Sequence, residues 1–239
     1  MAGRVAALLV AWLAAGPALA GSFSVSPIRL ELSPRRPAAI LTVRNEEDGA
    51  LVVQALPYAW SQPRGEDQLE ETRRLIVTPA IFTLAPHGEQ ILRIAAPGGA
   101  DGSQELPFRI VLSEIPGPAP LGFSGLRVAL RISLPAFVKP QAPAAAQLAW
   151  SYALRADGML EVRARNSGTG HLQVEGFEIA SADRALLLHT GAARYVLPGA
   201  AATWEIPGAP HLLPQPRLLI RGRSDAGDFS STGLPGPET

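Results

Sequence analysis

The side chains that could catalyse a reaction or bind a metal are few, and their spacing matches no known catalytic motif. None of the four histidines lies in a His-Glu-x-x-His pattern or at another metal-ligand spacing: His87, His171, His189 and His211. The chain has no cysteine, which excludes thiol chemistry and cysteine-ligated metals. The Gly-Phe-Ser-Gly segment at 122–125 is not the Gly-x-Ser-x-Gly motif of hydrolases. We therefore expect no enzyme activity, no metal and no other cofactor.

The histidine with the most suggestive surroundings is His171, which follows the glycine-containing segment 166–170. A glycine-rich loop binds phosphate when a helix begins directly after it. No helical pattern follows here, so we interpret His171 as a turn residue.

Composition also limits the partners. The chain of 239 residues is 47% apolar and 18% charged, and its formal net charge is zero. A nucleic-acid-binding protein needs a basic face, so we expect no nucleic-acid partner. The length suits two domains of ordinary size.

The first twenty residues have the features of a secretory signal peptide. Arg4 supplies the positive start, an apolar run follows over 5–15, and Ala18-Leu19-Ala20 has the small residues of a cleavage site. The run is too short to span a bilayer, although an uncleaved membrane anchor is the alternative. No second long apolar run follows, so we expect a soluble periplasmic protein that starts near Gly21, without membrane insertion.

The rest of the chain alternates short apolar runs with turn residues. Asp157-Gly158 lies between two alternating segments, 150–154 and 159–165, which predicts a β-hairpin. Many short strands with frequent turns are typical of β-sandwiches. A stiff proline-containing connection at 139–146 divides the chain. We predict an all-β protein with immunoglobulin-like domains at 21–140 and 141–230 and a disordered tail at 231–239.

The longest clean alternation is found at 126–138, immediately before this connection. Its apolar residues fall on one face: Leu126, Val128, Leu130, Ile132 and Leu134. An ordinary strand would use this face to line its own core. The alternative is that the strand lends these side chains to another protein, where each could contribute roughly 1.5–3 kcal/mol if fully buried.

Several short motifs, in their order and spacing, resemble those of the PapD-like periplasmic pilus chaperones of the chaperone–usher pathway. The resemblance extends over essentially the whole chain that follows the signal peptide. It rests on the following segments: Ser26-Pro27-Ile28-Arg29-Leu30, Asn45, Thr78-Pro79 with Leu84, Pro86 and Gly88, Ser113-Glu114-Ile115-Pro116, Phe137-Val138-Lys139-Pro140, Leu197-Pro198-Gly199 and Asp225-Ala226-Gly227.

The resemblance implies two sandwiches in an L-shaped arrangement and a function without catalysis. The strand at 126–134 would complete the unfinished sandwich of a pilus subunit, because a subunit without its last strand exposes edges that aggregate. An outer-membrane usher would then accept the complex. Whether the free protein caps this strand by forming a homodimer stays open.

The resemblance also implies residue roles. Arg29 would bind the C-terminal carboxylate of the subunit together with a lysine, but Pro135 occupies the lysine position. Arg131 or Lys139 could supply the second cation instead. With proline at this position, the sequence resembles a divergent branch of the family, whose subunits are similar to spore coat protein U. A second set would form an interdomain ion network: Arg93, Glu105, Lys139 and Asp225.

One other class of protein fits a β-sandwich composition, namely a sugar- or receptor-binding sandwich such as an adhesin or a pilus subunit itself. Subunits usually have a single incomplete sandwich, often with a disulfide. Two complete domains without cysteine argue against this alternative.

Overall fold

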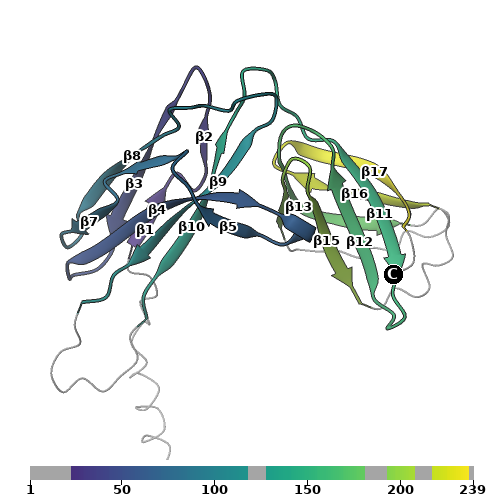
Figure 1. Cartoon of the computed structure of the whole chain (residues 1–239). Helices are drawn as coiled ribbons and strands as arrows, with labels where there is room; N and C mark the ends of the chain where they lie inside the picture. The colour runs from purple at the N-terminus through teal and green to yellow at the C-terminus, as the bar shows by residue number, and fades with distance from the viewer. Residues whose placement is uncertain (1–22, 118–127, 181–192, 208–216, 237–239) are drawn as a thin grey trace, which may run out of the picture.

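The computed structural model describes residues 23–117, 128–180, 193–207 and 217–236, and these fold into two β-sandwich halves that meet at an angle (Figure 1). The strands of the N-terminal half are β1 (Phe23–Ser26), β2 (Leu30–Leu32), β3 (Ala38–Asn45), β4 (Leu51–Ser61), β5 (Gln68–Glu71), β6 (Ile76–Thr78), β7 (Ile81–Leu84), β8 (Glu89–Ala95), β9 (Leu106–Glu114) and β10 (Arg131–Val138). One 3-10 turn, η2 (Pro63–Gly65), follows β4.

The N-terminal half consists of two sheets that face each other. One sheet has the order β1-β3-β8-β6, and the other has the order β2-β10-β9-β4-β5, with β7 also paired to β4. Alternate side chains of each strand point into a single core between the sheets, as a period of two requires. Leu41, Leu92 and Leu112 are fully buried there.

The C-terminal half is a single sheet that folds over its own core. Its strands are β11 (Leu148–Leu154), β12 (Leu160–Asn166), β13 (Leu172–Ala180), β14 (Arg194–Val196), β15 (Ala201–Ile206), β16 (Leu218–Ser224) and β17 (Gly227–Pro235). The sheet order is β14-β13-β16-β17-β11-β12-β15, and the end strands β14 and β15 contact each other. The core contains Trp150, Phe177 and Trp204, whose rings pack within 5.1–5.6 Å of one another.

The structure confirms the all-β prediction and the hairpin at Asp157-Gly158. β11 and β12 pair antiparallel from Leu148↔Asn166 to Leu154↔Leu160, and Gly158 has φ +83° in the turn. A positive φ costs glycine little because it has no Cβ. None of the described helical segments is long and apolar enough to cross a membrane.

The three predictions about segment boundaries have different outcomes. The predicted tail is wrong for 231–235, which form the end of β17 and pair with β11 and β16. A Cβ on Gly233 would lie 3.0 Å from Ile220 Cδ1, so a larger residue there would require the Ile220 side chain to shift. The signal peptide falls outside the described residues. The boundary between residues 140 and 141 stays a prediction, although β10 ends at Val138 and β11 begins at Leu148.

The connection between the halves is fixed by backbone contacts. Ala145 O accepts hydrogen bonds from Thr169 N and Gly170 N at 2.9 and 3.1 Å. A Cβ on Gly168 would lie 2.2 Å from Ala145 O, so only glycine allows this approach. Thr169 O also accepts a hydrogen bond from Glu105 N at 2.9 Å, which holds the loop at 167–170 and the adjoining His171 against the N-terminal half.

Candidate functional site

Strand β10 has two edges that differ along its length. Over its full length it pairs antiparallel with β9, from Arg131↔Ser113 to Val138↔Leu106. On its other edge β2 pairs in parallel, but only with residues 136–138. Among the described strands, none pairs with that edge over residues 131–135. An unpaired edge is a template for a strand from another chain.

The side chains along this strand change from exposed to buried. Val128, just before β10, is 80% exposed, Leu130 and Ile132 pack partly buried against the core, and Leu134 is only 4% exposed. Two expectations need correction. The described strand begins at Arg131 rather than at Leu126, which lies outside the described residues. Leu134 belongs to the protein's own core, which lies between the two sheets.

A chain of charged groups crosses the junction of the two halves beside the end of β10. Lys139 Nζ donates to Glu31 Oε2 at 2.6 Å, and Arg29 donates from Nη2 to Glu31 Oε1 at 2.8 Å. Arg29 Nη1 also donates to Asp225 Oδ2 at 2.6 Å. Lys139, Glu31 and Arg29 belong to the N-terminal half, whereas Asp225 lies in the turn between β16 and β17.

The series of charged groups continues from Asp225 through His171 to Glu105. His171 Nε2 lies 3.6 Å from Asp225 Oδ2, which is an ion-pair distance rather than a hydrogen bond. His171 Nδ1 lies 2.5 Å from Glu105 Oε1, and both side chains are almost fully buried. We call these six residues the interdomain ion chain: Lys139, Glu31, Arg29, Asp225, His171 and Glu105.

The pKa shifts follow from these contacts. Burial alone would lower the pKa of Arg29, but its hydrogen bonds to Glu31 and Asp225 raise it above the ordinary value. Burial would raise the pKa of Asp225, but His171, the backbone N–H of Gln173 and Arg29 hold it well below its usual range. The hydrogen bond from Lys139 is the largest cause that lowers the pKa of Glu31. These groups are therefore charged at neutral pH.

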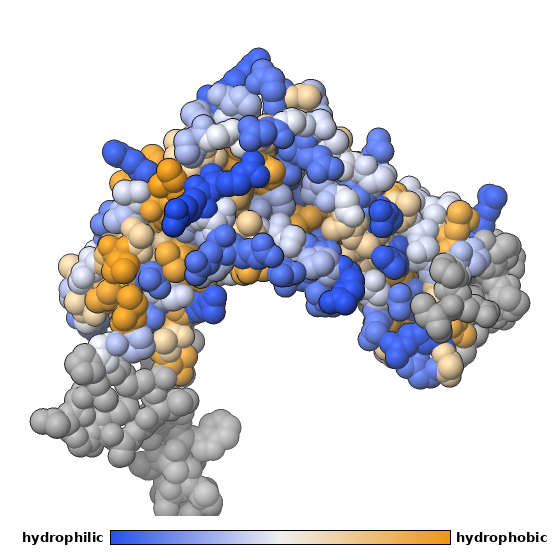
Figure 2. All heavy atoms as spheres, in the orientation of Figure 1, coloured by the Kyte–Doolittle hydropathy of each residue, from blue (hydrophilic) through white to orange (hydrophobic). Residues whose placement is uncertain are grey.

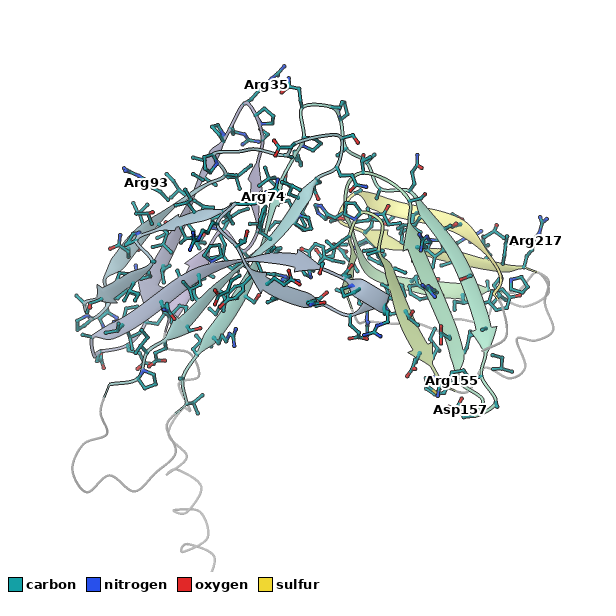
Figure 3. All side chains as sticks on the ribbon, in the orientation of Figure 1. Arg35, Arg74, Arg93, Arg155, Asp157 and Arg217 are labelled. Atoms are coloured by element: carbon teal, nitrogen blue, oxygen red, sulfur yellow. The ribbon has the colours of Figure 1, made fainter. Side chains whose placement is uncertain are left out.

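The structure brings together three of the four residues proposed for an interdomain network. Glu105, Lys139 and Asp225 all belong to the interdomain ion chain. Arg93 does not, and this prediction is wrong: it lies exposed on β8, and its side chain points away from the junction (Figure 3). Its cross-strand neighbours there are Ile40 on β3 and Thr78 on β6.

Sequence reasoning missed two members of this chain. Glu31 follows Arg29 by two residues, and a period of two could have placed both on one face of a strand. His171, interpreted as a turn residue, instead places its buried ring against the ring of Phe137, with centroids 3.5 Å apart and planes 6° apart. Its partner Glu105 is 66 residues away in sequence, so no local signal identified it.

Arg131 on β10 and Arg109 on the paired strand β9 occupy different environments. Arg131 is exposed, and it precedes Phe137 on β10 by six residues, which corresponds to about 20 Å along a strand. It is therefore not brought together with Arg29, whose guanidinium carbon lies 5.6 Å from the Phe137 ring centroid. Arg109 on β9 is the cross-strand neighbour of Pro135.

Arg109 is held against aromatic rings between the two halves. Its guanidinium carbon lies 3.7 Å from the Trp60 centroid and 5.6 Å from the Tyr195 centroid. Its Nη2 lies 3.7 Å from Asp67 Oδ2, and its side chain is only 16% exposed. Burial lowers its pKa, and Asp67 acts in the opposite direction. Arg29 also acts on Tyr195, lowering a tyrosine pKa that burial raises. Arg29 and Arg109 therefore both lower the pKa of Tyr195.

An apolar cluster and an amide complete the junction. Trp60, Phe137 and Leu197 are buried together, with Tyr195 and Ala200 packed against them. Gln62 accepts from the backbone N–H of Leu197 and donates to the carbonyl of Tyr195, both at 3.0 Å. Its Nε2 also donates to Asp67 Oδ1 at 2.9 Å. The C-terminal half is thereby fixed beside Arg109 as well as beside Arg29.

This architecture defines a class: a protein of two β-sandwiches with a charged junction and a partly unpaired strand leading into it. The sequence matches the family described as "Pili and flagellar-assembly chaperone, PapD N-terminal domain" over residues 22–144, just over half of the chain. The chain belongs to this family, which is not enzymatic. A search of curated protein sequences gives no match.

Solved structures agree on the fold. The structure of the CsuC–CsuE chaperone–tip adhesion subunit pre-assembly complex from archaic chaperone–usher Csu pili of Acinetobacter baumannii matches with TM-score 0.71 and 18% identity, covering 90% of this chain and 100% of that chain. The Salmonella enterica SafA pilin in complex with the SafB chaperone gives TM-score 0.60 and 18% identity, with coverage of 89% and 96%. The E. coli chaperone DraB gives 0.57 and 19%, with coverage of 89% and 96%.

Proposed function

We propose that this protein is a periplasmic chaperone that binds a pilus subunit by donating the beginning of β10 and the residues before it. The observation that carries the proposal is the edge of β10 at residues 131–135, for which the described structure contains no partner strand. Family membership and the chaperone–subunit complexes among similar structures support it.

The side chains next to this edge suit an apolar groove. Val128, Leu130 and Ile132 alternate along the chain and lie exposed or only partly buried. A subunit that lacks its last strand could bury them, and each would contribute up to roughly 1.5–3 kcal/mol. Backbone hydrogen bonds to the free edge would add affinity, as in other strand-addition complexes. Leu126 continues the same alternation in sequence.

The junction offers a site for the C-terminal carboxylate of the subunit. Arg29 was expected there, and Arg109 meets the need for a second cation that Pro135 cannot supply. The guanidinium of Arg29 lies beside the ring of Phe137, and that of Arg109 lies beside the ring of Tyr195. Arg109 is also the cross-strand neighbour of Pro135. An arginine can bind a carboxylate through two parallel hydrogen bonds. A carboxylate held at this point would fix the register of the subunit strand along β10.

The proposal includes export and delivery. The features of the first twenty residues support cleavage after Ala20 and a periplasmic location. An outer-membrane usher would receive the complex. A second subunit would then displace β10 from the groove of the first subunit. Because the exchange replaces one strand by another, it requires no covalent step.

The test is recovery of a co-expressed pilus subunit with the chaperone from the periplasmic fraction. A variant with Val128→Glu and Ile132→Glu should fold, because neither side chain is fully buried, yet lose the subunit. Two carboxylates entering an apolar groove without partners would be costly. The mature chain should begin at Gly21.

A matched control is available on the opposite sheet. Ile40 and Ile91 are 58% and 54% exposed on β3 and β8, where hydrophobic residues gather on the outer side of the N-terminal half (Figure 2). The double variant Ile40→Glu and Ile91→Glu introduces the same charges away from β10 and should recover the subunit normally. Equal recovery by the two double variants would rule out donation of β10.

A further inference from the structure

His171 is a titratable residue buried at the centre of the interdomain junction. Its side chain is only 5% exposed, and its ring is stacked on Phe137 of β10. Glu105 approaches from the start of β9 and Asp225 from the β16–β17 turn. Because Glu105 belongs to the N-terminal half and Asp225 to the C-terminal half, the imidazole joins the two halves through two carboxylates.

The charges around His171 balance only when the ring carries a proton. The interdomain ion chain contains two cations, Arg29 and Lys139, and three carboxylates, Glu31, Asp225 and Glu105. Tyr195, the remaining titratable group in contact with the ring, stays neutral because burial raises its pKa. With neutral His171 the cluster carries one uncompensated negative charge in a buried position. An unpaired buried charge is costly.

The direction of the pKa shift agrees with this count. Burial alone would lower the pKa of His171, but Asp225 and Glu105 raise it above the ordinary value of a histidine, against a smaller opposing effect of Arg29. The second ring nitrogen, Nε2, makes no hydrogen bond in the described part of the chain, and Asp225 Oδ2 at 3.6 Å is its nearest counter-charge.

We propose that His171 is a positioning residue whose protonation joins the two halves and determines how firmly Asp225 holds Arg29. The protonated ring bridges Glu105 and Asp225 and shares the charge of Asp225 with Arg29. When the ring loses its proton, only Arg29 neutralises Asp225 and the contact between the halves weakens. The consequence for carboxylate binding by Arg29 rests on the proposed function, whereas the junction itself can be tested in the free protein.

The first test is the thermal unfolding midpoint between pH 5.5 and 8.5. A histidine whose pKa is raised in the folded state contributes stability that is complete below its unfolded pKa, about 6.5, and is lost as pH rises through the folded pKa. The midpoint of the wild type should therefore fall by a few degrees towards alkaline pH. His171→Gln should reduce this fall, while His87→Gln is the matched control, because His87 is exposed and pairs with Asp48 away from the junction. Equal pH dependence in wild type and His171→Gln would overturn the proposal.

A second measurement does not depend on the folding of that variant. Histidine ring resonances of the wild type should include one that titrates above 6.5, and Asp225→Asn should lower that pKa. If every ring titrates at or below 6.5, the proposal is wrong. Because the chain lacks cysteine, spin labels can also be placed at Arg35→Cys and Arg217→Cys, one in each half (Figure 3). Their distance distribution should broaden as pH rises, and an unchanged distribution would contradict the proposal. Neither result depends on a pilus subunit, so failure here would leave the proposed function intact.

Discussion

The beginning and the end of β10 are built from the same alternating sequence but have opposite surroundings. From Arg131 to Ser133 the strand has one paired edge, and its side chains are exposed or half-buried. From Leu134 to Val138 every residue is buried, and the last three residues have partners on both edges. A single strand is therefore buried in the protein's own structure at its C-terminal end, while its N-terminal end stays available to a partner.

The end of β10 is buried on both faces because it belongs to two clusters. Leu134, Ala136 and Val138 enter the core of the N-terminal half. Phe137 points to the other face and packs with Trp60 and Leu197 between the halves. A strand covered on both faces is expected to be apolar without interruption, and the sequence Leu-Pro-Ala-Phe-Val at 134–138 has this character. The buried part of the strand thus contributes both to the core of the N-terminal half and to the contact between the halves.

The largest effect on stability should follow from removing the aromatic ring at the buried end of β10. Phe137→Ala deletes a fully buried side chain that touches Trp60, Tyr195 and His171. Such a truncation should lower the free energy of unfolding by about 3–5 kcal/mol. Chemical denaturation followed by tryptophan fluorescence would measure it, since Trp60 lies in the same cluster. A loss below about 1 kcal/mol would mean that the junction contributes little to stability.

The next effect concerns the residue where the two parts of the strand meet. Leu134→Ala should cost about 2–5 kcal/mol, because Leu134 is buried in the protein's own core. Subunit recovery should decline only in proportion to the loss of folded chaperone. Ser133→Ala is the control, since Ser133 is exposed on the neighbouring position. If Leu134→Ala kept full stability and lost the subunit, Leu134 would belong to the donated row after all.

The sequence allowed the strand to be predicted but not the place where its burial begins. Alternation from Leu126 to Leu134 is uniform, so nothing local separates Ile132 from Leu134. Leu134 is buried in the core between the two sheets, to which distant segments of the sequence contribute, whereas Ile132 only packs against that core. This difference depends on tertiary packing, which a periodic pattern does not encode.

The charged site was predictable to a similar extent. The resemblance located Arg29, Glu105, Lys139 and Asp225, and all four lie in the interdomain ion chain. It failed for Arg93, although the alternation of β8 around Leu92 and Ile94 could have indicated an outward side chain. Arg109 carried a usable signal, since it is a charged residue inside the mostly apolar strand 106–112. Its position opposite Pro135 required the register between β9 and β10.

The smallest effect on stability, and the sharpest on function, should come from Arg109, which lies beside the boundary between the two parts of β10. Arg109→Gln removes the guanidinium that stacks on Trp60, a contact worth about 0.5–2 kcal/mol. The variant should fold and yet recover much less subunit, because Arg29 would then have to bind the carboxylate alone. Periplasmic co-purification, normalised to the amount of folded chaperone, measures this effect.

The matched control for that substitution is Arg131→Gln, which removes the same charge from an exposed position on the neighbouring strand. Arg131 lies too far along β10 to act with Arg29, so its loss should leave recovery near the wild-type level. The opposite result, with Arg131→Gln impaired and Arg109→Gln normal, would move the carboxylate site away from the junction to the free beginning of the strand. In that case the N-terminal end of β10 would determine both the register and the affinity of the bound subunit. The buried C-terminal end would contribute to stability alone.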